Sequence, residues 1–352
     1  MTTFPTHPDQ LTRDWLSARL DRAVSEFAVE FLGEGAGLLA WVTRLRLTCD
    51  DDGPETVIAK FPSPSPENRA VATGFDMYQR EVEFYRDIAP SVAIRSPRCF
   101  HADLDPENAD FVLLLEDLGH LRIGDQVAGC TLEEAKALLR ALASLHASSW
   151  RGRGLPDVVS QNNEKQIAGM AGGFSAGWPV VLEQFGDLVP DTARGLGDRM
   201  PDAVGRLLAE MCVEPICVSH ADVRLDNIFF DDARLTAGPD EPAVALVDWQ
   251  SVCTSSPEQD VAYFLTQSVP REVLAKEDLV AYYHGELTSH GVDYDLEDCR
   301  ARYRVSALYL LNYAVTIAGT LDLQNDRGIA LARTLLGNSL AALEELDAFG
   351  LV

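Results

Sequence analysis

The feature that most constrains this chain is a set of two carboxylates and an amide placed beside short apolar runs. The stretch VSHADVRLDNIFFDD at 218–232 contains Asp222 and Asn227, and VALVDWQ at 244–250 contains Asp248. Apolar runs of this kind enter the interior of a protein, where an unpaired carboxylate is costly. The question is what role the chain has for acids placed there.

The spacing of these three residues points to phosphoryl transfer. From His220 the pattern is H-x-D-x-x-x-x-N, ending at Asn227, and the next predicted strand ends in Asp248. A loop and a strand end can gather three such groups around one cation, and Mg²⁺ prefers few protein oxygens together with phosphates and water. Asp222, if it stays off the metal, can take the proton of an attacking hydroxyl. Turn residues and a strand cap are the alternative for each residue alone, but the combination favours the functional interpretation.

Composition sets the boundaries for this hypothesis. The 352 residues, 47% of them hydrophobic, suffice for one large or two medium domains. A net charge of -26, spread along the chain, argues against nucleic acid or membrane partners and fits a soluble surface. No apolar run has membrane-spanning length, and the N-terminal MTTFPTHPDQ does not resemble a signal peptide. Seven scattered Cys without a C-x-x-C motif predict a reduced, cytoplasmic protein.

The first third of the chain predicts a small β-rich region. Thr12 is placed to cap a short helix that spaces its apolar residues on one face. The pattern then predicts three antiparallel strands within 27–62, with the turn GEGAG after the first and a hairpin after the second. It further predicts a loop at 63–75, a helix at 75–90 and a buried strand in FVLLLEDLG at 111–119.

The pattern after residue 120 is mostly helical. Thr131 and Glu134 form a capping box before a long amphipathic helix. The segment 151–200 is rich in Gly and weakly patterned, which predicts loops and short helices, and two further helices follow at 278–291 and 299–321. We therefore expect an N-lobe at 1–118 that binds nucleotide, and a C-lobe at 119–352 that carries the catalytic loop and the substrate-binding helices.

The sequence also resembles a known family. HADVRLDN followed by VDWQ resembles the catalytic and metal loops of the aminoglycoside phosphotransferase and choline kinase group, most closely ecdysteroid-kinase-like (CHK kinase-like) proteins and their bacterial relatives. The similarity extends through LTRDWL, REVEFY, LLLEDL, LASLHASSW and PEQDVAYFL. It implies an α+β, two-lobed, protein-kinase-like fold, with a small N-lobe of antiparallel sheet plus helix and a large, mainly helical C-lobe. Carried over by position, Asp222 is the catalytic base, and Asn227 and Asp248 are the Mg²⁺ ligands.

Several residues depart from the pattern of protein kinases. Ala221 stands where protein kinases carry Arg, and Trp249-Gln250 replaces Phe-Gly after the metal-binding Asp. The chain also lacks an activation segment ending in Ala-Pro-Glu. We therefore expect a small hydroxylated substrate and no protein substrate.

An independent check comes from the predicted N-lobe. The chain has only four Lys against 25 Arg, and Lys60 closes the apolar strand TVIAK. Lys60 alone could be an edge residue that extends its charge to water. The phosphoryl-transfer template, however, needs one Lys on the third strand and an acid on the next helix to orient it. Glu81 in REVEFY fits that acid; Glu83 is the alternative, and Glu81 is preferred because it lies one turn before Tyr85 on the face expected to pack inward.

Two backbone segments complete the predicted nucleotide site. The turn GEGAG lets Gly33, Gly35 and Gly37 bring N–H groups near phosphates, although a Gly-rich turn is a weak signal. In LLLEDLG the resemblance implies that the backbone of Glu116 and Leu118 meets the edges of adenine, as the family's linker does.

Four further polar residues lie near the motif. His146, among Leu and Ala, is interpreted as a core residue, and His220 as a brace of the loop. Asp260 in PEQDVAYFL is interpreted as a helix cap that also holds the catalytic loop, with contact to substrate as the alternative. Arg224 lies where it could reach the transferred phosphate, and a surface position is the alternative.

The resulting prediction is a phosphotransferase that uses ATP and Mg²⁺ and acts on a hydroxyl of a small molecule. The acceptor stays open among aminoglycosides, choline-like amines, sugars, and steroids or other lipophilic alcohols. A pseudokinase-like protein that binds nucleotide or ligand without turnover is the first alternative, and a metal-dependent hydrolase is the second. The hydrolase leaves Lys60, the Gly turn and the linker strand unexplained.

Overall fold

The computed structural model describes residues 3–32, 39–49, 53–237, 242–320 and 326–352. The chain divides into two compact units. Unit 1 comprises Met1–Pro90, Ser96–Leu121 and Val247–Ser251, and unit 2 comprises Ser91–Arg95, Arg122–Leu246 and Val252–Val352. The short segment that contains Asp248 therefore belongs to unit 1, although it is flanked in sequence by unit 2.

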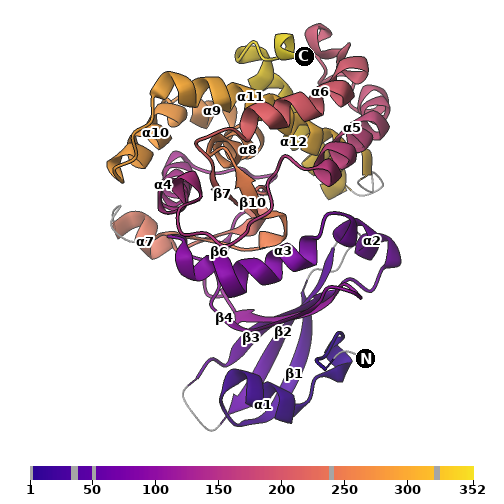
Figure 1. Cartoon of the computed structure of the whole chain (residues 1–352), viewed down its shortest axis with the longest axis vertical. Helices are drawn as coiled ribbons and strands as arrows, with labels where there is room; N and C mark the ends of the chain where they lie inside the picture. Colours follow the sequence, from indigo (N-terminus) through magenta and orange to yellow (C-terminus); the bar gives the residue numbers. More distant parts are fainter. Residues whose placement is uncertain (1–2, 33–38, 50–52, 238–241, 321–325) are drawn as a thin grey trace. The chain divides into compact units, whose positions relative to one another are not determined.

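Unit 1 is built on an antiparallel sheet of five strands in the order β1-β2-β3-β5-β4 (Figure 1). The three predicted N-terminal strands and the predicted buried strand are present, whereas β4 is an element that the sequence pattern did not predict. The strands are β1 (Val24–Leu32), β2 (Ala40–Cys49), β3 (Thr56–Pro62), β4 (Cys99–Asp105) and β5 (Asp110–Glu116).

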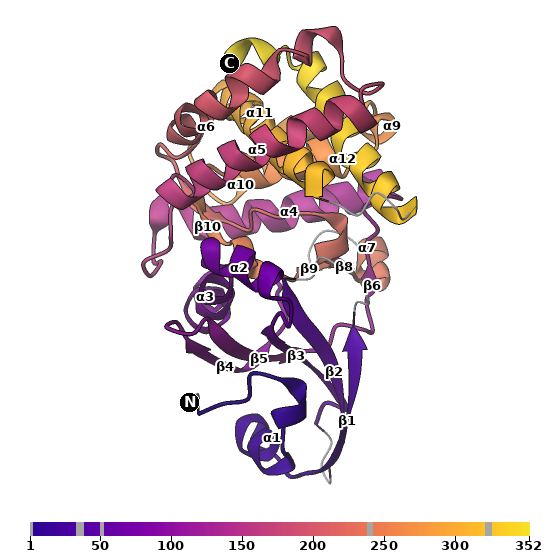
Figure 2. The ribbon, with the colours of Figure 1, turned by 90° about the vertical axis from the view of Figure 1, so that its right-hand side faces the viewer.

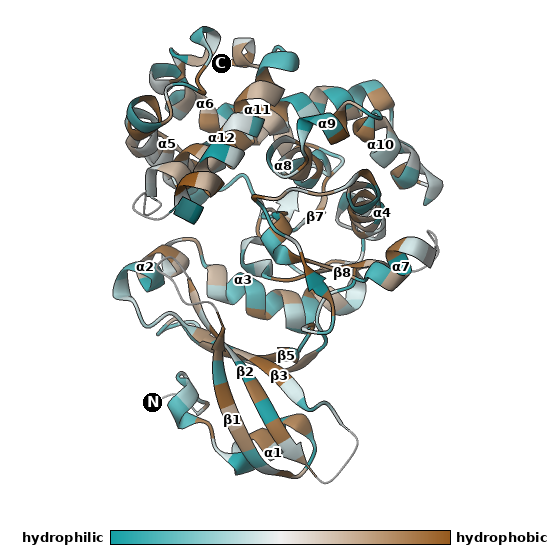
Figure 3. Ribbon diagram, turned by 180° about the vertical axis from the view of Figure 1, so that it is seen from behind, coloured by the Kyte–Doolittle hydropathy of each residue, from teal (hydrophilic) through white to brown (hydrophobic). Residues whose placement is uncertain are grey.

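One face of this sheet forms the core of unit 1. Alternate residues of β2, β3 and β5 point to it, as the period of two along a strand requires, and they pack against α1 (Arg13–Leu20). Figure 3 shows the resulting alternation of hydrophobic and hydrophilic residues along the strands. Thr12 caps α1 as predicted, because its side chain accepts the N–H of Trp15. The core residues on the sheet include Leu45, Leu47, Val57, Ala59, Phe61, Val112 and Leu114.

Helical residues from 66 to 88 complete unit 1. The predicted loop at 63–75 is wrong, because α2 (Pro66–Gly74) occupies most of it. Ser65 accepts the N–H of Asn68 and Pro66 takes the first helical position, two start signals that outweigh the Ser- and Pro-rich appearance of the segment. The predicted next helix exists as α3 (Met77–Glu83), which continues into a π-helical turn, Phe84–Ile88.

Unit 2 is mainly helical. Figures 1 and 2 show α11 beside α5, α8 and α12. The capping box of Thr131 and Glu134 at the start of α4 is confirmed. The helices are α4 (Leu132–Ser148), α5 (Glu164–Gln184), α6 (Leu196–Met211), α7 (Asp232–Ala237), α8 (Glu258–Gln267), α9 (Arg271–Leu274), α10 (Leu279–Ser289), α11 (Leu296–Thr320) and α12 (Asp326–Glu345).

The prediction of loops and short helices at 151–200 is confirmed for 153–163 and 185–195, but it is wrong for α5, which is 21 residues long. Two of its glycines, Gly173 and Gly177, serve close packing against α11 rather than turns. A Cβ on Gly177 would lie 2.5 Å from a backbone oxygen of α11, and a Cβ on Gly319 would lie 2.5 Å from the Cα of Gly177. The absence of side chains at these positions lets α5 and α11 approach closely, and the same glycines remove the apolar periodicity that identifies a helix.

Two small sheets in unit 2 carry the segment that contains Asp222. β7 (Cys217–Ser219) pairs with β10 (Cys253–Ser255), and β8 (Ile228–Phe230) pairs with β9 (Val244–Leu246) and with β6 (Arg122–Ile123). The loop 220–227 therefore runs from a strand of one sheet to a strand of the other.

The predicted α+β class is confirmed, with an antiparallel sheet in the N-terminal part and mostly helices in the C-terminal part. All seven cysteines lie in the described part of the chain, and each is a free thiol. Among the described helices, none combines the length and the apolar character needed to cross a bilayer.

Candidate active site

Unit 1 brings Lys60 and Glu81 together. The Nζ of Lys60 lies 2.6 Å from Oε1 and 2.7 Å from Oε2 of Glu81. Both side chains are buried, at 7% and 1% relative exposure, so the alternative of an exposed edge lysine is wrong. Glu83, the alternative partner, instead accepts a hydrogen bond from Gln79 at 2.7 Å. Glu81 and Tyr85 are both buried, which confirms the prediction that their helix face packs inward.

Asp248 joins the same cluster. Its Oδ1 lies 2.9 Å from the Nζ of Lys60, so one ammonium group contacts two carboxylates within unit 1. Asp248 has a φ of 66°, a left-handed conformation that is costly for a residue other than Gly and is concentrated at functional sites. The next residue, Trp249, is fully buried and stacks on Phe84. The stack fixes the backbone that presents Asp248.

Burial and charge act in opposite directions in this cluster. Burial opposes the charge of Lys60, but the carboxylates of Asp248 and Glu81 outweigh it and raise the pKa of Lys60. For Glu81, burial raises the pKa to about 7 against the opposing effect of Lys60, and the charge of Asp248 adds to the increase. Lys60 is therefore firmly protonated, and the buried carboxylate of Glu81 and the partly exposed carboxylate of Asp248 share its single charge.

The predicted linker is held in a defined shape. The N–H of Glu116 donates to the carbonyl oxygen of Arg98 at 2.8 Å, and the carboxylate of Glu116 accepts the N–H of Arg98 at 3.1 Å. The guanidinium of Arg44 binds both carboxylate oxygens of Asp117, at 2.5 and 3.1 Å. Leu118 is buried. These contacts fix the backbone on which the predicted adenine contacts of Glu116 and Leu118 depend; the contacts themselves stay a prediction.

The predicted phosphate contacts of Gly33, Gly35 and Gly37 lie outside the residues that the structure describes. The strands on either side are described: Leu32 ends β1 and pairs with Val42 of β2.

Unit 2 holds the loop 220–227 from α8. The backbone N–H groups of His220 and Ala221 donate to the two carboxylate oxygens of Asp260, each at 2.8 Å. Ala221 has a φ of 63°, so these bonds stabilise a left-handed turn immediately before Asp222. The predicted loop-holding role of Asp260 is confirmed. Its role as the helix cap is wrong, because Pro257 precedes α8 and Asp260 lies inside the first turn.

The far end of the loop is held by Gln126, which the sequence did not indicate. The side chain is fully buried, and its Oε1 accepts the N–H of Leu225 at 2.8 Å. Its Nε2 donates to the carbonyl oxygen of Gln267 at 2.8 Å. Because Gln126 is separated from the loop by about a hundred residues and belongs to no motif, only the tertiary structure reveals it.

The carboxylate of Asp222 is held at both oxygens. Its Oδ1 accepts from the hydroxyl of Tyr263 at 2.8 Å and lies 3.2 Å from the Nε of Arg224. Its Oδ2 accepts from the Nδ2 of Asn227 at 3.1 Å, and the same Nδ2 donates to the Asp222 carbonyl oxygen at 3.0 Å. The structure thus brings together Asp222, Asn227 and Arg224. Tyr263 is a contact that the sequence prediction missed.

The residues predicted to bind metal offer suitable donors. Because Asn227 directs its Nδ2 to Asp222, its amide oxygen is the atom left to coordinate a cation, and Asp248 offers a carboxylate. One or two protein oxygens, completed by phosphate and water, are what Mg²⁺ takes. Among the described residues, no three His, Cys, Asp or Glu side chains form an all-protein metal cage.

The two histidines near the loop have structural contacts. His146 is fully buried, with its Nδ1 2.7 Å from the Tyr283 hydroxyl and its Nε2 3.3 Å from Asp260. The Nδ1 of His220 accepts the N–H of Asp222 at 3.3 Å. Both interpretations from the sequence, a core residue and a brace, are confirmed.

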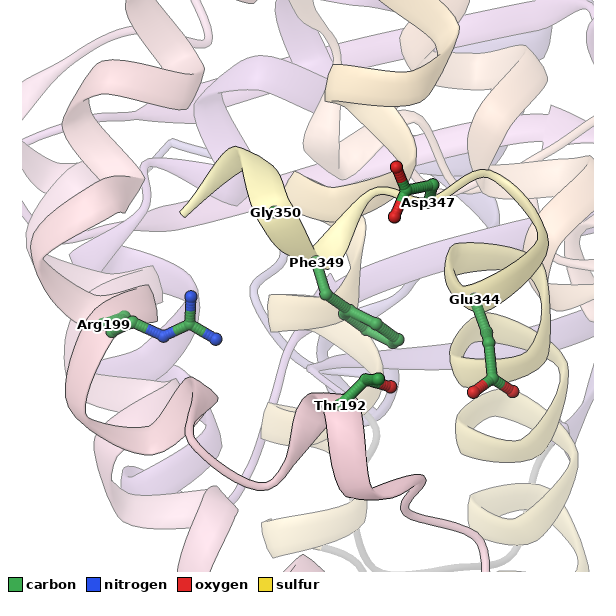
Figure 4. A pocket seen from close by; sticks show the side chains of 6 residues that line it. All are labelled: Thr192, Arg199, Glu344, Asp347, Phe349 and Gly350. Carbon is green, nitrogen blue, oxygen red and sulfur yellow. The ribbon is translucent and has the colours of Figure 1, made fainter.

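A hollow of about 310 Å³ lies elsewhere in unit 2, near the C-terminus (Figure 4). None of the predicted site residues lines it. The guanidinium of Arg199 at its edge donates to the carbonyl oxygens of Gly195 and Val352. The lining residues are Thr192, Arg199, Glu344, Asp347, Phe349 and Gly350.

Several solved structures share the fold of this chain. The candidate aminoglycoside phosphotransferase of Ralstonia eutropha is 14% identical, with a TM-score of 0.56 over 95% of this chain and 97% of that chain. The GDP complex of wild-type aminoglycoside 2'-phosphotransferase-IIIa is 15% identical, with a TM-score of 0.53 over 93% and 96%. The ethanolamine kinase of Plasmodium vivax is 11% identical, with a TM-score of 0.52 over 97% and 86%. The chain therefore has the protein-kinase-like fold of these small-molecule kinases, as the sequence resemblance implied.

The family follows from the sequence itself. Residues 34–293 match the ecdysteroid kinase-like family, and the chain belongs to that family. A comparison with curated protein sequences finds no match.

Proposed function

We propose that this protein is an ATP- and Mg²⁺-dependent phosphotransferase that moves the γ-phosphate to a hydroxyl of a small molecule. The observation that carries the proposal is the position of Lys60, whose ammonium contacts Glu81 at 2.6 Å and Asp248 at 2.9 Å. A lysine oriented by a helix-borne acid beside a metal-binding aspartate is the phosphate-handling arrangement of kinases. A hydrolase that used the same acids would have no need of it.

The proposed nucleotide site combines side chains, the backbone of the predicted linker and three glycines. Lys60, oriented by Glu81, contacts the α- and β-phosphates, and the backbone of Glu116 and Leu118 meets adenine. Asn227 and Asp248 hold Mg²⁺, which when bound neutralises charge on the phosphates. The glycines that contribute N–H groups to the phosphates are Gly33, Gly35 and Gly37.

Asp222 acts on the acceptor. Its carboxylate has only acceptor capacity when ionised, so it orients the acceptor hydroxyl and takes its proton as the acceptor oxygen bonds to the γ-phosphorus. The bond between that phosphorus and the β–γ bridging oxygen breaks, and ADP leaves with the electron pair. We assign Arg224, whose Nε lies 3.2 Å from Oδ1 of Asp222, to the transferred phosphate.

The assignment extends to the organisation and the substrate of the protein. We propose a nucleotide-binding N-lobe at 1–118, a C-lobe at 119–352 with the catalytic loop and the substrate helices, and a cytoplasmic location. The names of the similar structures, which cite aminoglycosides and ethanolamine, and the name of the family, which cites ecdysteroids, support a small hydroxylated acceptor. These molecules include polar and lipophilic compounds, so acceptors of both kinds belong in the test.

The test is a screen of hydroxylated metabolites, sterols and aminoglycosides with ATP and Mg²⁺. A gain of one phosphate group on an acceptor, detected by mass, would support the proposal. The matched control is Asp222→Asn, which keeps the size and polarity of the side chain but cannot take the proton. Nucleotide binding without transfer to any acceptor would instead support a pseudokinase-like binding protein.

A further inference from the structure

We infer that Tyr263 is a positioning residue for Asp222: its hydroxyl holds the carboxylate in the orientation that receives the acceptor hydroxyl. This inference rests on the proposed function, because it assigns a role within the same site. Neither HADVRLDN nor VDWQ contains Tyr263, which lies on α8 about forty residues after the loop.

The contact between Tyr263 and Asp222 has a definite direction. The two oxygens are 2.8 Å apart, and the tyrosine side chain is fully buried. Burial, followed by the negative charge of Asp222, raises the pKa of Tyr263 well above its ordinary value. The phenol therefore stays protonated and donates to Oδ1. Since Asn227 donates to Oδ2, the carboxylate plane is fixed from both sides.

The helix that carries Tyr263 also fixes the backbone of the loop. Asp260 and Tyr263 are three residues apart, so their side chains lie on one face of α8. Asp260 binds the N–H groups of His220 and Ala221, and Tyr263 binds the side chain of the next residue, Asp222. One turn of one helix therefore sets both the position of the loop and the orientation of its carboxylate.

A second helix supports the ring of Tyr263. The ring packs edge-on against Tyr313 of α11, with centroids 5.8 Å apart and planes inclined by 74°. The hydroxyl of Tyr313 accepts from the side-chain amides of Gln161 and Gln166, at 2.9 and 3.0 Å. Because Tyr313 is itself held in this way, Tyr263 has a supported ring as well as a bonded hydroxyl, as precise positioning requires.

The consequence is a specific kinetic defect when the hydroxyl is removed. In Tyr263→Phe the carboxylate keeps its contacts with Asn227 and Arg224, so it stays in place but can rotate. A misplaced catalytic group costs rate rather than nucleotide binding, and a misplacement near 1 Å can cost about a hundredfold. We expect kcat to fall by about tenfold to a hundredfold, with the KM for ATP unchanged.

The experiment compares Tyr263→Phe with Tyr303→Phe in the full chain. Tyr303 is also a buried tyrosine of unit 2, but besides burial the carboxylate that raises its pKa is Asp278, and Asp222 does not contribute. Thermal denaturation of both variants controls for a general loss of stability. Only Tyr263→Phe should lose kcat. Equal kcat for Tyr263→Phe and the wild type would overturn the inference, as would equal losses for the two variants.

A double-mutant cycle tests whether Tyr263 acts through Asp222. If it does, Tyr263→Phe has little further effect once Asp222→Asn has removed the carboxylate, and the two losses are strongly non-additive. Losses that multiply independently would show that Tyr263 acts elsewhere.

Hydrogen exchange separates this inference from the proposed function. Amide exchange of residues 220–227 requires no turnover, and we expect it to be faster in Tyr263→Phe than in Tyr303→Phe or the wild type. Unchanged exchange in this loop would overturn the positioning role. Failure of the wild type to phosphorylate any acceptor would overturn the proposed function. The hydrogen-exchange result would then still decide whether Tyr263 positions the loop.

Discussion

Phe84 and Trp249 lie face to face, with ring centroids 3.7 Å apart and planes inclined by 5°. Phe84 follows Glu81 by three residues, and Trp249 directly follows Asp248. The stack therefore ties together the two segments whose acids share Lys60. The stack also explains why Trp249 can replace the Phe that protein kinases carry after the metal-binding Asp, because Trp offers a larger stacking surface than Phe.

The first prediction concerns this stack. Trp249→Ala removes a fully buried aromatic side chain, and we expect a loss of about 3–5 kcal/mol in the free energy of unfolding. The control is Phe31→Ala, which truncates an aromatic side chain that is 51% exposed and should cost clearly less. Urea denaturation measures both. Similar losses for the two variants would mean that the stack is not a main support of unit 1.

The second prediction concerns the charge balance around Lys60. Lys60→Met leaves the buried carboxylate of Glu81 and the partly exposed carboxylate of Asp248 without their cation, and the loss of the buried pair costs about 3–5 kcal/mol. Burial already raises the pKa of Glu81, and loss of the opposing effect of Lys60 raises it further. A raised pKa in the folded state gives stability that is present at low pH, below the ordinary value of 4.5, and is lost as pH rises. The variant should therefore lose more stability than the wild type between pH 5 and pH 8.

Two further variants test the origin of this pH dependence. Adding Glu81→Gln to Lys60→Met removes the titrating group and should flatten the difference from the wild type. Lys136→Met breaks a more exposed pair with Glu277 and should cost only about 0–1 kcal/mol. Urea denaturation at both pH values gives the comparison. A Lys60→Met variant that becomes more stable as pH rises would contradict the assignment.

The polar residues near Asp222 show which contacts a sequence motif can predict and which it cannot. Asp222 and Asn227 could be predicted to lie together because they share one short loop, and their side chains are 3.1 Å apart. Tyr263 could not, since its contact depends on how α8 lies against that loop. A signal did exist: once Asp260 is assigned to the loop, the residue three positions later lies on the same helix face. Gln126 offers no such signal.

Helix prediction failed where packing contradicted the local pattern. The glycines of α5 give it a weak apolar periodicity, yet Gly177 is required where the backbone of α11 passes within 2.5 Å of a Cβ position. In α2 the Ser-Pro-rich start predicts a loop, although Ser65 and Pro66 are a helix cap and a first-turn residue. By contrast, Thr12 and Thr131 were placed correctly, because a cap is a local interaction that a few residues specify.

The third prediction separates the structural role of Asp260 from contact with substrate. In Asp260→Asn one oxygen is replaced by an NH₂ group that cannot accept the second N–H, and an unpaired buried group costs about 1–3 kcal/mol. Asp278→Asn is the control, because Asp278 caps α10 and Asn caps a helix equally well. Urea denaturation should show the loss only for Asp260→Asn. Lost transfer activity at unchanged stability would favour the alternative that Asp260 contacts substrate.

The fourth prediction is that ATP binds more weakly without a divalent metal. Asn227 and Asp248 offer oxygen atoms to a cation rather than positive charge to phosphates, so their contribution to binding needs the metal. Calorimetric titration of ATP with Mg²⁺ and with EDTA measures the difference. Equal affinities in the two titrations would remove the metal-binding roles of both residues.

The last prediction compares two isosteric changes, Asp222→Asn and Asp248→Asn. A positioned base contributes roughly 10²–10⁴ in rate, which is about 3–5 kcal/mol at 1.36 kcal/mol per tenfold. Asp222→Asn should lose kcat by that order with little change in ATP affinity, because Asp222 is bound by Tyr263 and Asn227 and is not assigned to the metal. Asp248→Asn should weaken both turnover and Mg²⁺-dependent ATP binding, since Asp248 contacts Lys60 and is assigned to the metal. Steady-state kinetics with an acceptor from the screen, or slow ATP hydrolysis in its place, gives kcat, and calorimetry gives the affinity. If Asp222→Asn keeps nearly full transfer activity, the proton passes to another group and the assignment of Asp222 as the base is wrong.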